Sequence, residues 1–294
     1  MRYRITHRTT YTYDSPVTVS HYLARLAPRS LPSQACPWHE MHIFPEPGER
    51  AARTDYFGNG TVYFEIEGAH ERLEVVSRSL VEITPATPPD PATSPPWETV
   101  RDSCRADDFN SATAAGEFIF ASPLITPEKT FADYAKQSFP ATRPILAGVC
   151  DLNSRIHRDF IFDPAATDVA TPIERVFEKR RGVCQDFAQV MIACLRSIGL
   201  PARYVSGYLE TMPPPGKVKL VGADASHAWV SVWCGEELGW TDADPTNNLL
   251  PSIRHITVAW GRDFNDVSPL RGVTIGAGKP ELSVGVDVMP EGAL

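Results

Sequence analysis

The 294-residue sequence lacks an excess of positive charge. Its 28 lysine and arginine residues are outnumbered by 36 aspartate and glutamate residues, which gives a formal net charge of −8. Phosphate binding depends on clustered lysine and arginine, so we expect no nucleic-acid partner. The sequence also lacks an apolar run long enough to cross a bilayer, so we expect no membrane association.

A signal peptide is also missing, because no apolar run follows the basic residues of the opening MRYRITHRTTYTYD. We therefore expect a cytoplasmic protein. The six cysteines form no CxxC pair, which argues against a zinc ribbon or a redox dithiol. Most cysteines of a cytoplasmic protein are small buried hydrophobic residues. The six cysteines of this sequence are Cys36, Cys104, Cys150, Cys184, Cys194 and Cys234.

We expect neither a metal nor a cofactor. His39 and His42 are three residues apart, which is not the i, i+4 spacing of a zinc-binding helix. The carboxylates at Asp107, Asp108 and Asp151 do not follow a calcium-loop pattern.

The composition is typical of a folded protein, with 43% hydrophobic and 22% charged residues. Residues 1–84 alternate in a period of two that is rich in β-formers, as in Ile5, His7 and Thr9. This pattern predicts an N-terminal antiparallel β-sandwich-like domain, with a small barrel as the alternative. Residues 85–97 hold six prolines and predict a stiff, extended linker.

A second domain is expected over residues 98–294. Short helices are possible at 98–105 and 127–137, and apolar residues from 146 to 156 fit one face of a helix. The motif TPIE at 171–174 predicts a further helix start, with Thr171 as the cap and Gly182 as the C-terminal stop.

The pattern around Cys184 predicts a second helix directly after that stop. Apolar residues from Phe187 to Ile198 follow at helical spacing, and Gly199 ends the run. Three predicted strands come next, at 202–210, 227–234 and 239–242, and a loop begins at 212–216.

Cys184 is the strongest candidate for a nucleophile. It lies in the first turn of the predicted helix, where free N–H groups and a partial positive charge favour a thiolate. Its own backbone N–H can also serve an oxyanion. The structural alternative is a buried cysteine, as expected for Cys194 on the apolar stripe of the same helix.

A base and an orienting carboxylate follow in the sequence. His227 opens the predicted strand at 227–234 and can take the proton of a thiol, although a structural histidine is the more common case. Asp242 and Asp244 are both candidates to orient the imidazole. Their spacing does not choose between them, because residues two apart on a strand share a face. Asp244 also precedes a proline, which is typical of a turn.

These residues sit in strings that resemble the transglutaminase-like superfamily. The strings are GVCQDFA at 182–188, LRSIGLPARYVSGY at 195–208, ASHAWV at 225–230, GW at 239–240 and DPT at 244–246. The similarity covers about 145–275 as the core. The opening strands resemble, more loosely, the N-terminal β-domain of bacterial members.

The resemblance implies an α+β fold with a papain-like core, in which a helix bearing the cysteine packs on an antiparallel sheet. It implies catalytic roles for Cys184 as nucleophile, His227 as base and Asp244 as orienting carboxylate. The implied reaction is acyl transfer from an amide or peptide carbonyl through a thioester, with a peptide or protein as substrate. Hydrolysis is favoured, and the alternatives are transamidation of protein glutamine and a non-catalytic interaction module. Neither the oligomeric state nor the second oxyanion donor follows from the sequence.

Overall fold

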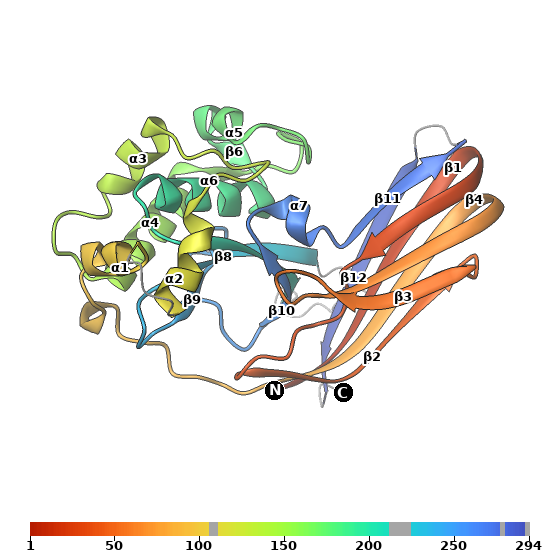
Figure 1. The fold of residues 1–294 in the computed structure, drawn as a ribbon, viewed down its shortest axis with the longest axis horizontal. Coiled ribbons are helices and arrows are strands. Elements are labelled where there is room, and N and C mark those ends of the chain that lie inside the picture. The colour runs from red at the N-terminus through yellow and green to blue at the C-terminus, as the bar shows by residue number, and fades with distance from the viewer. Residues whose placement is uncertain (106–110, 212–224, 277–279, 292–294) are drawn as a thin grey trace, which may run out of the picture.

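The computed structural model describes residues 1–105, 111–211, 225–276 and 280–291. Figure 1 shows two parts: a region of helices around a small sheet, and a region of long, curved strands. The predicted α+β architecture with an all-β N-terminal region is confirmed. The predicted loop at 212–216 lies outside the described residues.

The strand-rich region is one six-stranded antiparallel sheet with the order β11-β1-β4-β2, in which β12 also pairs with β1 and β3 with β4. The N-terminal strands are β1 (Arg2–Ala24), β2 (Gln34–Phe44), β3 (Glu49–Thr54) and β4 (Gly60–Ile83). The predicted period of two is confirmed in β1, where Tyr3, Ile5 and His7 are buried.

The two long strands, β1 and β4, are curved along their length (Figure 1). Their pairing register shifts between Thr12 and Val17, as expected at a β-bulge. Residues from both halves of the bent sheet then share one apolar core, with Leu73 and Val75 from one half and Phe64 and Ile66 from the other.

The expected C-terminal boundary of the second domain is wrong. Strands β11 (Leu270–Ile275) and β12 (Glu281–Pro290) leave the second domain and pair with β1. Val286 and Val288 are buried opposite His7 and Ile5, so the first sheet needs the C-terminal strands to complete its buried face. Pairing between such distant segments leaves little trace in local sequence.

The proline-rich segment runs along the helical region. It contains one short turn, η1 (Pro91–Thr93), and is otherwise irregular. Its end is held by α4 (Ile145–Asp159), because the N–H of Ile145 donates to the Pro95 carbonyl at 2.8 Å and that of Leu146 to Ser94 Oγ at 3.0 Å.

The second region is built on a four-stranded antiparallel sheet with the order β10-β7-β8-β9. Its strands are β7 (Ala202–Leu209), β8 (Ala225–Trp233), β9 (Trp240–Ala243) and β10 (His255–Gly261). The helix α6 (Cys184–Ser197) packs on β7 and β8. Its predicted apolar stripe is confirmed, since residues 187–195 are all buried.

Further helices surround α6, and four of them match the predicted segments. The remaining helices and short strands of this region are α1 (Trp97–Ser103), α2 (Ser111–Ala115), η2 (Gly116–Ile119), α3 (Lys129–Lys136), α4 (Ile145–Asp159), β5 (Ile161–Phe162), α5 (Ile173–Lys179), β6 (Arg181–Gly182) and α7 (Phe264–Val267). Helices α1, α3 and α4 correspond to the predictions at 98–105, 127–137 and 146–156, and α5 to the helix predicted from the TPIE motif at 171–174. The described helices include none that is both long and apolar enough to span a membrane.

The predicted caps of α5 are wrong in detail. Thr171 bonds to Asp168 instead of capping the helix, which starts after Pro172. The left-handed residue at the end is Arg180, with φ 54°, and Gly182 lies beyond it in β6. The Arg180 guanidinium lies 3.9 Å from the centre of the Phe177 ring, a cation–π contact that stabilises this turn.

Polar side chains of β1 and β2 join the two regions. Tyr3 donates its hydroxyl to Glu210 at 2.9 Å, and His7 Nδ1 lies 3.1 Å from the Tyr208 hydroxyl. The Gln34 side-chain amide bonds to both the N–H and the carbonyl of Thr257 in β10, at 2.9 and 2.8 Å. The N-terminal sheet therefore sets the position of β7 and β10.

We expect His7 to weaken the fold in acid. Burial lowers the pKa of His7 to about 4, whereas an unfolded histidine titrates near pH 6.5. Below about pH 6.5 the unfolded chain therefore binds a proton that the folded chain does not, and the free energy of unfolding falls as the pH drops toward 4. When the free energy of unfolding is measured in urea, it should fall less with decreasing pH in His7→Gln than in the wild type.

The matched control is His42→Gln, which replaces an exposed histidine of β2. It should keep the wild-type decline in the free energy of unfolding between about pH 7 and about pH 5. An identical decline in His7→Gln would show that His7 does not cause it.

Candidate active site

The start of α6 holds Cys184 in a fixed position. The residues before it are tied down by the parallel pair β5–β6. The Asp186 carboxylate turns back to accept the N–H of Val183 at 2.8 Å, which satisfies one of the donors left open at the helix start. Gly182 makes this possible, because a Cβ there would lie 2.5 Å from Asp186 Oδ2. Cys184 is half-buried as the first residue of the helix.

Three other cysteines have the surroundings of structural thiols. Burial raises the pKa of Cys104 to about 11 and the pKa values of Cys194 and Cys234 to about 12. All three are buried in the apolar core, as expected for Cys194 from the sequence. These thiols stay protonated at neutral pH.

The structure brings Cys184 together with His227 and Asp244. His227 lies near the start of β8, and its Nε2 is 2.7 Å from Asp244 Oδ2. The Cys184 thiol lies near the same imidazole, close enough to contribute to the raised pKa of His227. Because Nε2 faces the carboxylate, Nδ1 is the nitrogen left for the thiol. The three side chains form one continuous line.

This line favours a charged imidazole. Burial opposes the charge of His227, but hydrogen bonds to Asp244 and Cys184 outweigh it and raise the pKa of His227 to about 9. Burial likewise works against the charge of Asp244, yet the hydrogen bonds from His227 and His255 hold the pKa of that carboxyl well below its usual range. Both shifts favour an imidazolium beside a carboxylate.

Asp244 is also fixed by the turn that follows β9. Its Oδ1 accepts the backbone N–H of Thr246 at 2.9 Å and that of Asn247 at 3.1 Å. The Asn247 side-chain amide adds a 2.7 Å hydrogen bond to Oδ2. Asp244 therefore forms the turn expected of an Asp-Pro pair and also contacts His227.

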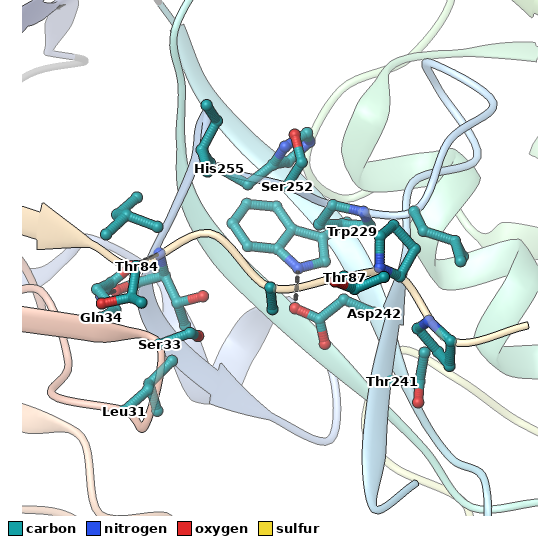
Figure 2. Close-up of a pocket in the computed structure, with 18 residues that line it drawn as sticks. Leu31, Ser33, Gln34, Thr84, Thr87, Trp229, Thr241, Asp242, Ser252 and His255 are labelled. Atoms are coloured by element: carbon teal, nitrogen blue, oxygen red, sulfur yellow. Dashed lines mark hydrogen bonds between the residues drawn. The ribbon is translucent and has the colours of Figure 1, made fainter. Parts of the chain in front are cut away.

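Asp242, the other candidate carboxylate, has a different partner. It accepts the indole N–H of Trp229 at 2.8 Å, as Figure 2 shows. Asp242 lies within β9 and Asp244 just beyond its end, and the two carboxylates meet different residues of β8, Trp229 and His227. The geometry separates them where sequence spacing did not.

No metal site is evident at the histidines of β2. His39 Nε2 lies 3.0 Å from Ser77 Oγ and His42 Nε2 lies 3.2 Å from Glu40 Oε1. Residues three apart on a strand point to opposite faces, so the two imidazoles do not converge.

The described residues contain one buried group whose ligand atoms lie within 4.8 Å of one another: His227, Asp244 and His255. Both Nε2 atoms lie at hydrogen-bond distance from the same carboxylate oxygen, 2.7 Å for His227 and 3.1 Å for His255. A bound cation would displace the protons that make these bonds. The spacing therefore favours a hydrogen-bonded cluster over a metal centre.

Sequence reasoning missed two residues of this cluster, Asn247 and His255. His255 opens β10, which was not predicted although HITVAW alternates at 255–260. Asn247 follows the DPT string directly, and nothing in the local pattern distinguishes it from an ordinary turn residue.

The comparisons with known proteins identify the family of this chain. A model of the bacterial transglutaminase-like N-terminal region matches residues 3–82, and the transglutaminase-like superfamily core matches residues 133–245. An uncharacterized protein of Mycobacterium tuberculosis is 42% identical over 298 residues, which cover 98% of this chain and 93% of that protein. The chain belongs to the transglutaminase-like superfamily, in the bacterial form with this N-terminal region, and the predicted resemblance is confirmed.

Two further similarities are more limited. A protein-glutamine gamma-glutamyltransferase of Pseudomonas aeruginosa is 31% identical over 124 residues, which are 42% of this chain and 18% of that protein. The crystal structure of a candidate cysteine protease from Cytophaga hutchinsonii superposes with a TM-score of 0.76 at 18% identity, covering 99% of this chain and 91% of that one. The latter supports the fold alone.

We expect the two aspartates to differ in their effect on Cys184. Asp244→Asn should slow alkylation of Cys184 by iodoacetamide at least about tenfold near neutral pH, because it removes the charge that stabilises the imidazolium. Asp242→Asn should change this rate less than about twofold but lower the free energy of unfolding by about 1 kcal/mol, through a weaker bond to Trp229. Peptide mass spectrometry measures the first effect and urea unfolding the second. Equal slowing by both substitutions would reject the assignment.

Proposed function

We propose that the protein is a cysteine peptidase or amidase. Cys184 is the nucleophile, His227 the general base and acid, and Asp244 the carboxylate that orients the imidazole. The observation that carries this proposal is the 2.7 Å contact between His227 Nε2 and Asp244 Oδ2, beside the half-buried Cys184 thiol at the start of α6, which helps to raise the pKa of His227.

The chemistry proceeds in two steps. His227 holds the proton of the thiol, and Cys184 Sγ attacks the carbonyl carbon of an amide. The backbone N–H of Cys184 stabilises the resulting oxyanion. The C–N bond then breaks, His227 gives its proton to the departing amine, and a thioester remains. In the second step His227 takes a proton from water, which attacks the thioester and releases a carboxylic acid and the thiol.

A transamidase is the second candidate. In that case an amine replaces water at the thioester and forms a new amide. The similarity to the Pseudomonas protein-glutamine gamma-glutamyltransferase favours this reaction. We place hydrolysis first because it requires only water, whereas transamidation also requires an amine-binding surface and exclusion of water.

A non-catalytic interaction module is the third candidate. Such a module has no chemical need for a thiol, an imidazole and a carboxylate in line. A buried charge such as that of Asp244 is costly unless it is fully paired, so a binding surface alone gives no reason to retain it. The proposal therefore favours turnover.

We expect the protein to cleave amide bonds in a mixture of peptides and to lose this activity in Cys184→Ala. The reaction mixture contains a dansylated primary amine and a glutamine-rich acceptor protein, and both peptide products and incorporated dansyl groups are measured. Cys36→Ala is the matched control, because Cys36 is also half-buried but lies on β2. It should retain full activity.

Each outcome of this experiment selects one candidate. New peptide termini or released ammonia without dansyl incorporation supports hydrolysis. Incorporation that depends on Cys184 supports the transamidase instead. If neither the wild type nor Cys184→Ala forms either product, the interaction module is favoured.

A further inference from the structure

A second imidazole lies against the proposed orienting carboxylate. His255, the first residue of β10, places its Nε2 3.1 Å from Asp244 Oδ2, the same oxygen that His227 contacts from the other side. His255 is 6% exposed and Asp244 is fully buried. Water therefore has little access to this contact.

The hydrogen bonds define which ring nitrogen of His255 is the donor. An ionised carboxylate only accepts, so the Nε2 of His255 must carry the proton. Its Nδ1 is buried and has no hydrogen-bond partner among the described residues. Burial without a partner costs less for a nitrogen that carries no proton than for an N–H group, which would lose its hydrogen bond to water without gaining another. The Nε2–H of His255 is therefore the donor that faces Asp244.

The ring of His255 is held by Trp229. The two rings meet edge to face, with centroids 5.2 Å apart, and the Trp229 indole is anchored by its bond to Asp242. Gly207 leaves room for the indole, because a Cβ there would lie 2.5 Å from the Trp229 ring. Figure 2 shows His255, Trp229 and Asp242 together at one cavity. Its volume is about 220 Å³, and Thr84 and residues 86–89 also line it.

We propose that His255 is a positioning residue for the reaction: its Nε2–H holds Asp244 Oδ2 in the orientation that His227 requires. The inference rests on the proposed function, since it concerns the same carboxylate. Without this donor, Asp244 keeps its bonds to the turn but loses the contact that faces β10. Its carboxylate then rotates more freely, and the imidazole of His227 is less well oriented toward Cys184.

The test measures alkylation of Cys184 by iodoacetamide in the intact protein, at about pH 6.5 and at about pH 10, where an ordinary thiol is ionised without help. His255→Leu should slow the reaction about tenfold at the lower pH, as expected for one lost hydrogen bond to a charged group. It should have little effect at the higher pH. His255→Gln keeps an N–H donor and should restore most of the rate.

His7→Gln is the control, since it removes a buried imidazole that contacts Tyr208 and lies outside the cluster. It should alkylate as the wild type does. Wild-type metal content, measured by mass spectrometry of the elements, should be substoichiometric. A stoichiometric metal that is lost in His255→Leu would replace the proposal with a metal site.

Two outcomes separate this inference from the proposed function. If wild-type Cys184 reacts no faster at about pH 6.5 than the half-buried Cys36 and Cys150, both fail. If Cys184 is reactive and His255→Leu matches the wild type, or loses rate equally at both pH values without rescue by His255→Gln, only the positioning role fails.

Discussion

The buried carboxylate of Asp244 is the point on which the rest of the site depends. It accepts hydrogen bonds from two backbone N–H groups, from Asn247 and from two imidazoles. A charge removed from water is stable only when its acceptor sites are filled in this way. The same bonds that make the charge tolerable also fix its direction, so stability of the turn after β9 and orientation of His227 have one cause.

The N-terminal sheet contributes to this site from a distance. Gln34 holds the backbone of Thr257, two residues beyond His255, and Tyr3 bonds to Glu210 at the end of β7. Strand β10, which carries His255 against Asp244, is therefore positioned partly by β2. The C-terminal strands β11 and β12 complete the sheet that makes these contacts. The N-terminal region therefore supports the four-stranded sheet that carries His227 and His255.

The parts that the sequence predicts are those with local periodicity. The stripe on α6 and the strands around His227 repeat at spacings that identify them, and family resemblance assigns Asp244 a role. The return of β12 to β1 depends on contacts between the two chain ends, which no local pattern encodes. The choice between Asp242 and Asp244 depends on which side chain of β8 each carboxylate meets, because Asp242 bonds to Trp229 and Asp244 to His227. His255 becomes meaningful only when β10 is placed in three dimensions.

The most direct measurement is the titration of the His227 imidazole, followed by NMR in protein labelled with 15N-histidine and assigned with His227→Gln. We expect a pKa of about 9, because the bonds to Asp244 and Cys184 outweigh burial, and a lower pKa in Asp244→Asn. A pKa near 6.5, the value of an unperturbed histidine, that does not change in Asp244→Asn would contradict the proposed line of Cys184, His227 and Asp244.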